Sequence, residues 1–149
     1  MHNTGVIYKV KTASQEAIYQ HLLACDRYFK PALSKKVVIS EYSKKIFDKA
    51  ITFEAWNKAI LSGLLATYFD EISKSAFITN VSVVESAIKT GIASQLMKMC
   101  IEYAFHVHAK EIILEVNSQN SHAIGLYEKF LFKHSQMNGE EYVMRLAIP

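Results

Sequence analysis

The feature that most constrains the fold is residues 77–96, with the sequence FITNVSVVESAIKTGIASQL. Its first half is rich in branched apolar residues of the kind that favour a buried strand. These residues are Ile78, Val81, Val83 and Val84. A polar segment, 85–90, then leads to Gly91, which permits a tight turn, and to an apolar pattern typical of a helix. Unpaired N–H groups at a helix start carry partial positive charge, so this strand, turn and helix are suited to bind phosphate.

The rest of the chain alternates between the two periodicities of regular structure. Apolar residues recur at helical spacing in four segments: 14–27, 37–49, 92–108 and 122–129. Apolar runs predict further strands at 6–10, 51–56, 59–69 and 111–116, and a closing hairpin over 132–148. Gly63 lies inside one run, where we expect a bulge or the close approach of another backbone. The order of elements predicts an α/β fold in one domain, 1–149, with a mixed sheet covered by helices on both faces.

Composition and charge narrow the class of protein. Half of the 149 residues are hydrophobic and 21% are charged, which is typical of a globular domain that buries a core without disulfides. The formal net charge of +3 is spread over lysines with acidic neighbours, which favours a solvated surface over nucleic-acid binding. Cys25 and Cys100 have no metal-binding or redox spacing. Because His106 and His108 fall on different faces of a helix and the other histidines are isolated, we expect no metal site.

The first ten residues lack the apolar segment of a signal peptide, and no run of about 18 consecutive apolar residues occurs. We therefore expect a soluble cytoplasmic protein that does not associate with membranes. The sequence leaves the oligomeric state open, with a homodimer as one alternative.

Two motifs in order resemble the GCN5-related N-acetyltransferase (GNAT) family. VSVVESAIKTGIASQLM, at 81–97, is similar to the family's strand, Q/R-x-x-G-x-G/A loop and helix. LEVNSQNSHAIGLYEKFLF, at 114–132, is similar to its LEV, Asn and A-I-x-L-Y-E-K-x-G-F signature. The resemblance covers about 52–132, and the most similar branches are ribosomal-protein N-terminal acetyltransferases and acetyltransferases of polysaccharide gene clusters. It implies a mixed, mostly antiparallel sheet of six or seven strands with helices on both faces, acetyl-CoA as cosubstrate, and no metal.

The resemblance also implies roles for individual residues. The loop would bind the pyrophosphate of acetyl-CoA through backbone amides, and the strand before it would pair its backbone with the pantetheine arm. Asn120 would hydrogen-bond that arm, Tyr127 would stand near the thioester sulfur as general acid, and Glu115 occupies the position of a candidate base. The loop residues are Lys89, Thr90, Gly91, Ile92, Ala93 and Ser94, and the strand residues are Val81 and Val83. Two positions depart from the family pattern, Ile88 in place of Arg or Gln and Leu131 in place of Gly.

Taken alone, three of these residues have simpler explanations. Tyr127 fits the core face of a helix, Glu115 fits a solvent-facing strand position, and Asn120 fits a helix cap. Other candidates are Glu85 and His122 for the base, and Tyr68, Glu41 and Asp70 for contacts with the acceptor. The acceptor itself is not identified by any motif.

Acyl transfer from a thioester requires a neutral acceptor amine. At pH 7, deprotonating an α-amino group costs about 1.4 kcal/mol or less, whereas deprotonating a lysine costs about 4.6 kcal/mol. A modest base therefore suffices for an amine of low pKa. We expect an N-acetyltransferase that acts on a primary amine of a small molecule, such as an amino sugar, or on a protein N-terminus. The alternative is a sensor that binds acyl-CoA without transferring the acyl group.

Overall fold

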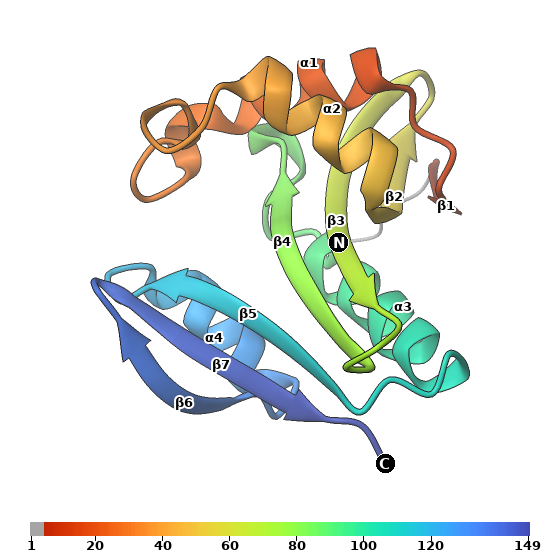
Figure 1. Ribbon diagram of the computed structural model, residues 1–149. Coiled ribbons are helices and arrows are strands. Elements are labelled where there is room, and N and C mark those ends of the chain that lie inside the picture. The colour runs from red at the N-terminus through yellow and green to blue at the C-terminus, as the bar shows by residue number, and fades with distance from the viewer. Residues whose placement is uncertain (1–4) are drawn as a thin grey trace.

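Residues 5–149 are described by a computed structural model, in which seven strands form one sheet flanked by four helices (Figure 1). The strands are β1 (Val6–Val10), β2 (Ile51–Asn57), β3 (Ile60–Asp70), β4 (Ser75–Val83), β5 (Glu111–Asn117), β6 (Lys133–Asn138) and β7 (Glu141–Ala147). The helices are α1 (Gln15–Cys25), α2 (Ile39–Lys49), α3 (Ile92–His106) and α4 (Ser121–Lys129), with 3₁₀ helices η1 (Asp26–Tyr28), η2 (Leu33–Lys35) and η3 (Glu85–Ala87). The strand order is β1-β2-β3-β4-β5-β7-β6, and β4 and β5 are the parallel pair in this otherwise antiparallel sheet. The predicted mixed, mostly antiparallel α/β sheet is confirmed.

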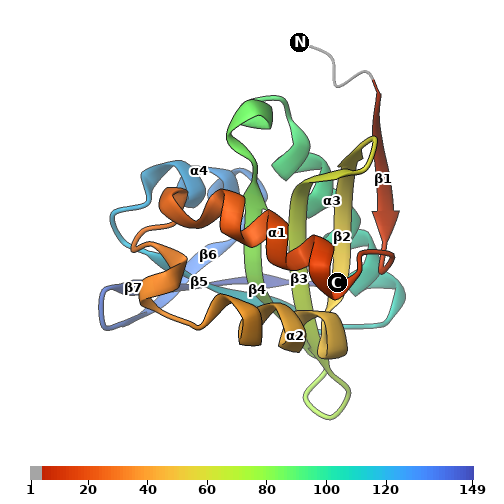
Figure 2. The ribbon, with the colours of Figure 1, turned by 90° about the horizontal axis from the view of Figure 1, so that it is seen from above.

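Helices cover both faces of the sheet, as predicted (Figure 2). The two faces explain the continuous apolar run of β3, in which Leu64 and Leu65 are both fully buried. Successive side chains of a strand point to opposite faces. Leu64 accordingly packs with α1 and α2, and Leu65 packs with α3. The core on the first side includes Ile18, Leu22 and Ile46, and the core on the second includes Leu96, Met97, Ile112 and Leu114.

The parallel neighbours β4 and β5 separate part-way along their length. They pair over Ser75–Ile78 of β4, and the register of β4 against β3 then skips Thr79. Such an extra residue is a β-bulge, which bends the strand and reverses the faces to which later side chains point. Ile78 and Val81, three residues apart, therefore both pack toward α3. Beyond the bulge the two strands diverge like the arms of a V (Figure 1).

Gly63 in β3 allows α3 to approach the sheet closely. A Cβ atom at this position would lie 2.5 Å from Ile92 Cγ2 and 3.2 Å from Leu96 Cδ1. The register between β2 and β3 also shifts beside it, between Ala55 and Trp56. The bulge expected near Gly63 is thus present, but the close approach is made by side chains of α3 and not by another backbone. The contact holds the first turn of α3 against the sheet.

Leu131, where the family motif has glycine, ends α4 in the left-handed conformation with φ of 72°. Its N–H donates to the carbonyl of Glu128 (2.9 Å), and the N–H of Phe132 donates to the carbonyl of Tyr127 (3.1 Å). These two bonds form a Schellman cap, in which the left-handed residue is usually glycine. The Phe132 and Tyr127 rings also pack, with centroids 6.0 Å apart. The turn is therefore kept, at the cost of strain at Leu131.

Replacing Leu131 with glycine should stabilise the protein by about 1 kcal/mol, because the left-handed conformation costs a residue with a Cβ about 1–2 kcal/mol. The Leu131 side chain is 72% exposed, so its removal sacrifices little packing. Leu131→Ala is the matched control, since it removes the same side chain but keeps the strain. Urea denaturation measures both free energies of unfolding. Equal stability of the glycine and alanine variants would contradict the assignment of strain.

Candidate active site

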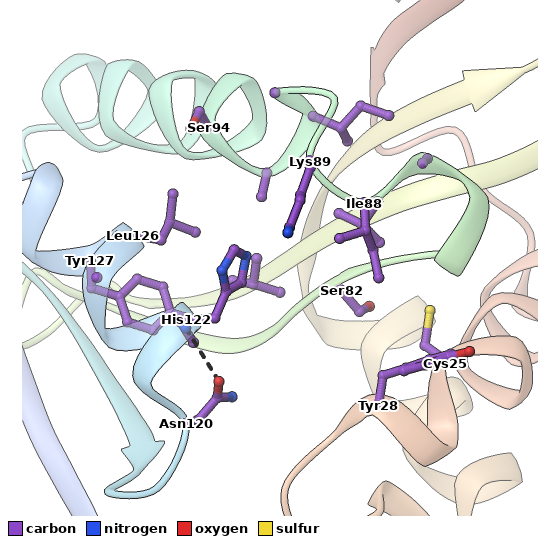
Figure 3. Close-up of a pocket in the computed structure, with 18 of the residues that line it drawn as sticks. Cys25, Tyr28, Ser82, Ile88, Lys89, Ser94, Asn120, His122, Leu126 and Tyr127 are labelled. Atoms are coloured by element: carbon purple, nitrogen blue, oxygen red, sulfur yellow. Dashed lines mark hydrogen bonds between the residues drawn. The ribbon is translucent and has the colours of Figure 1, made fainter.

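A cavity of about 600 Å³ lies beside the part of β4 that no longer pairs with β5 (Figure 3). Its walls come from four parts of the chain: the end of α1 with η1, β4 beyond the bulge, the loop into α3, and α4. All residues predicted to bind the cofactor line this cavity except Thr90. Those that line it are Val81, Val83, Lys89, Gly91, Ile92, Ala93, Ser94, Asn120 and Tyr127.

The loop before α3 is shaped by two left-handed residues, Lys89 with φ of 67° and Gly91 with φ of 87°. Thr90 lies between them, and its hydroxyl donates to the carbonyl of Ala87, which closes the loop on η3. Gly91 is the N-cap of α3 and has no side chain that could occupy the first-turn amides, whereas α1 and α4 have side-chain caps. The amides of the first turn, with the positive end of the helix dipole, are therefore available to an anionic ligand.

Two lysines bring positive charge to this helix end. The side chain of Lys89 extends into the cavity (Figure 3). Lys129 of α4 lines the cavity as well, and its Nζ donates to Ser94 Oγ at 3.4 Å. Ile88 presents an apolar side chain where the family motif has Arg or Gln. The helix amides and two neighbouring cations together suit a diphosphate, even without a charged side chain at Ile88.

The edge of β4 forms the next part of the wall. Val81, Ser82 and Val83 line the cavity, and they lie beyond the residues of β4 that pair with β5. An unpaired strand edge offers N–H and C=O groups to an extended ligand. Asn120 is the N-cap of α4, and its Oδ1 accepts the Ala123 N–H at 3.2 Å. The side-chain N–H groups of Asn120 are the donors that it can offer to a ligand.

Tyr127 lies where the large cavity meets a smaller one of about 140 Å³. The residues common to both linings are Phe29, Val81, Asn120, Ala123 and Tyr127. Tyr127 is buried, and this burial raises its pKa above the ordinary value of about 10. Its hydroxyl group therefore stays protonated at neutral pH and can donate a hydrogen bond.

The smaller cavity carries charged side chains on two walls. The connection between α1 and α2 contributes Lys30 and Lys36, and the sheet contributes Glu115 of β5 and Glu141 of β7. Lys36 Nζ lies 3.3 Å from Glu141 Oε2. Glu115, the predicted base, is exposed and accepts a hydrogen bond from Asn138 Nδ2 at 2.9 Å. Lys36 and Glu141 are far apart in the sequence, as are Glu115 and Asn138, so local sequence patterns did not indicate these contacts.

Four other candidates lie away from both cavities. Glu85 forms an exposed ion pair with Arg27 (3.7 Å), and Asp70 accepts backbone N–H groups within the β3–β4 turn. Glu41 belongs to α2, and Tyr68 packs with the core beneath that helix. Within residues 5–149, no group of three or more His, Cys, Asp and Glu side chains is arranged to hold a metal ion. No helix in this range is long and apolar enough to span a membrane.

A buried polar network behind β4 was not predicted from the sequence. His21 of α1 is almost fully buried, and its Nδ1–H donates to the carbonyl of Leu61 at 2.7 Å. Its Nε2 lies 2.8 Å from the hydroxyl oxygen of Ser82, which is hydrogen-bonded to Asn80 at 2.7 Å. The Cys25 sulfur lies 3.7 Å from the same Nε2. Burial lowers the pKa of His21 to about 4 against the opposing effect of its hydrogen bonds, and burial raises the pKa of Cys25 to about 11, so both groups are neutral at pH 7.

Acidification from pH 7 to pH 5 should destabilise the protein by about 2 kcal/mol through His21. The unfolded chain binds a proton on this histidine below about pH 6.5, whereas the folded chain binds it only near pH 4, so stability falls across that window as the pH falls. Urea denaturation at several pH values measures the slope. His21→Leu should remove most of it, and His106→Gln, at an exposed site, should not. A slope that survives in His21→Leu would show that other groups cause it.

A sequence model described as the acetyltransferase (GNAT) family matches residues 16–132. Curated protein sequences give no significant match. Similar solved structures include the ribosomal-protein-S18-alanine N-acetyltransferase of Escherichia coli, with 17% identity, a TM-score of 0.72, and coverage of 95% of this chain and 94% of that one.

Two further similar structures were determined with bound ligands. NAA60 of Arabidopsis thaliana, in complex with a bisubstrate analogue, has 18% identity, a TM-score of 0.75, and coverage of 95% of this chain and 97% of that one. The PaiA N-acetyltransferase of Thermoplasma acidophilum, in complex with coenzyme A, has 14% identity, a TM-score of 0.76, and coverage of 95% and 99%. At such identities the likeness concerns the fold.

Proposed function

The chain belongs to the acetyltransferase (GNAT) family and is an acetyl-CoA-dependent N-acetyltransferase, and we propose that it acetylates a primary amine of a small molecule or of a protein N-terminus. The observation that carries this proposal is the meeting of two cavities at Tyr127. The large cavity has the features that acetyl-CoA requires, and the smaller one carries charged groups suited to an amine. A nucleophile in the smaller cavity and a thioester in the larger one would be held in reacting distance.

The proposed binding of acetyl-CoA uses three of the four walls of the large cavity: the loop into α3, β4 and α4. The phosphates would lie against the first-turn amides of α3, with Lys89 and Lys129 beside them. The pantetheine arm would extend along the β4 edge at Val81 and Val83, as an added strand. The side-chain N–H groups of Asn120 would donate to the same arm. The thioester would then reach the junction with the smaller cavity.

Tyr127 is the proposed general acid in the transfer step. The amine nitrogen forms a bond to the acetyl carbon, the carbon–sulfur bond breaks, and the sulfur leaves with negative charge. A thiol has a pKa of about 8.5, which lies at least about 1.5 units below that of Tyr127, so complete transfer of the tyrosine proton to sulfur is uphill by about 2 kcal/mol or more. Tyr127 therefore acts mainly by donating a hydrogen bond to the departing thiolate.

Glu115 is the proposed base that accepts the proton of the amine. It lines the smaller cavity with Tyr127, and its exposure allows a water molecule to relay the proton. The alternative is His122, which lines the large cavity at the start of α4 (Figure 3). The kcat/KM values of Glu115→Gln and His122→Gln at one pH distinguish them, because loss of the true base lowers kcat/KM and loss of the other residue does not.

Calorimetry and a thiol-release assay test the proposed function. Acetyl-CoA should bind, and free thiol should form only when an amine is present. Lys89→Met should weaken binding about tenfold through loss of a charged contact, and Lys98→Met, an exposed lysine further along α3, should leave it unchanged. Binding without thiol release by any amine would support the sensor alternative. No binding by the folded protein would refute the proposal.

A further inference from the structure

The charges around the smaller cavity are only partly neutralised. Lys36 and Glu141 pair with each other at 3.3 Å. Among the described residues 5–149, Lys30 has no ion-pair or hydrogen-bond partner, and Glu115 is engaged by the uncharged side chain of Asn138. Among these residues, Lys30 on the wall formed by the α1–α2 connection and Glu115 on the wall formed by β5 therefore have no oppositely charged partner.

We propose that the acceptor is a compact primary amine that carries an anionic group, a carboxylate or a phosphate, a few bonds from its nitrogen. The inference rests on the proposed acetyl transfer and names the substrate class for it. Glu115 attracts the ammonium form and holds it on the side of the cavity that Tyr127 shares. Lys30 binds the anionic group on the opposite wall. Each end of the acceptor thus meets the charge that the protein leaves unpaired.

The size of the cavity favours a compact acceptor. Its volume of about 140 Å³ corresponds to the space of about five water molecules in the liquid, which accommodates an amine with few other atoms. Phe29, Pro31 and Leu33 line the same wall as Lys30. Lys30 itself is exposed, so its attraction for an anion is the moderate one of a partly solvated ion pair.

The wall that carries Lys30 is fixed before any acceptor arrives. The Lys36–Glu141 ion pair joins the α1–α2 connection to β7 across 105 residues of sequence. Within the connection, the Asp26 carboxylate accepts the Ser34 N–H at 2.7 Å. The connection accordingly lies beside the ends of β5 and β7 in Figure 2. These contacts hold the backbone of the connection beside the cavity, whereas the Lys30 side chain itself is exposed.

The same arrangement disfavours two other acceptors. A neutral amino sugar would leave Lys30 without a counter-charge. A protein N-terminus has its chain carboxylate far from the amine, so it would meet Lys30 only through an acidic side chain. Both leave a cation at the cavity without a partner, whereas an amino acid or an aminophosphonate satisfies it.

Matched pairs of amines test the proposal. α-Amino acids are compared with their amides, and 2-aminoethylphosphonate is compared with ethylamine, by thiol release with saturating acetyl-CoA. The anionic member should have at least tenfold higher kcat/KM, although the amide has the less basic nitrogen and is intrinsically easier to deprotonate. The pair with the larger preference tells whether carboxylate or phosphate is the natural group.

Lys30→Met shows whether Lys30 causes the preference. The variant should raise KM for the anionic amine at least tenfold, and leave KM for acetyl-CoA and the rates with neutral amines unchanged. Lys35→Met is the matched control, because Lys35 is an exposed neighbour that does not line the cavity. Lys30→Glu should reverse the preference toward amines without an anionic group.

The outcomes separate this inference from the proposed function. Equal rates within each pair, or a preference that survives in Lys30→Met, would overturn the inference and leave acetyl transfer standing. Turnover of peptides but of no small anionic amine would overturn it in favour of a protein N-terminus. Failure of the folded protein to bind acetyl-CoA in calorimetry would overturn the proposed function itself.

Discussion

Tyr127→Phe should lower kcat about 100-fold while changing the dissociation constant of acetyl-CoA less than twofold. The substitution removes one hydroxyl group at the junction of the two cavities and keeps the ring that packs against Phe132. A hydrogen bond to the departing thiolate strengthens as charge develops on sulfur, so its loss affects the transition state more than bound acetyl-CoA. General acid catalysis by one side chain typically contributes about 10²–10⁴-fold, and the raised pKa of Tyr127 places the expected effect at the lower end.

Stopped-flow thiol release and calorimetry on the same preparations measure the two quantities. Tyr103→Phe is the matched control, since it removes a hydroxyl from α3 at a residue that lines neither cavity. Its kinetics should equal those of the wild type. Unchanged turnover in Tyr127→Phe would remove Tyr127 from the mechanism, and a matching loss of acetyl-CoA affinity would assign it to binding instead.

The strands and helices were predictable because apolar periodicity is a local property of the sequence. The bulge of β4 is also visible in the sequence, because the alternation of apolar residues shifts by one position. Ala76 and Ile78 occupy even-numbered positions, whereas Val81 and Val83 occupy odd-numbered ones. The β-bulge explains this change of phase, but alternation alone does not tell whether the strand also leaves its neighbour. Where β4 stops pairing with β5 depends on residues that are far apart in the sequence, so local patterns do not predict the space in which the cavities lie.

The anion-binding end of the large cavity was also visible in the sequence, because its loop and helix are contiguous around Gly91. The walls of the smaller cavity were not. Lys36 and Glu141 meet across 105 residues of sequence, and nothing in either local sequence indicates the other. Tyr68 and Glu41, chosen as acceptor contacts, lie instead in the region of α2, because spacing identifies the apolar face of a segment and not the element that covers it.

The largest expected loss of stability follows from Glu54, a buried carboxylate of β2 whose hydrogen-bond donors are all uncharged. Its oxygens accept five hydrogen bonds, from Thr12 N (3.0 Å) and Oγ1 (2.5 Å), Ala13 N (3.0 Å), Thr52 Oγ1 (2.6 Å) and Trp56 Nε1 (3.0 Å). Burial alone would raise the pKa of Glu54, but these bonds outweigh it and hold the pKa below its usual value. The carboxylate thereby fastens the connection between β1 and α1 to the sheet.

Glu54→Gln should reduce the free energy of unfolding by about 3 kcal/mol at pH 7. Whichever oxygen becomes the amide nitrogen, at least two donors lose their acceptor, and a buried donor without a partner costs about 1–3 kcal/mol. Glu102→Gln, at an exposed position on α3, should cost almost nothing. A loss below about 0.5 kcal/mol in Glu54→Gln would show that the rearranged hydroxyl groups satisfy the amide fully.

The pH dependence of stability distinguishes a charged Glu54 from a protonated one. Because its folded pKa lies below the unfolded value of about 4.3, its contribution is fully present above that value and is lost as the pH falls through the folded pKa. The loss due to His21 begins at higher pH, near 6.5, so the two contributions occupy successive windows. Glu54→Gln should therefore flatten the stability profile below about pH 4.3 and keep the slope between pH 7 and pH 5. A slope unchanged below pH 4.3 would mean that Glu54 is already protonated in the folded protein. The connection between β1 and α1 would then be held by a neutral carboxyl group.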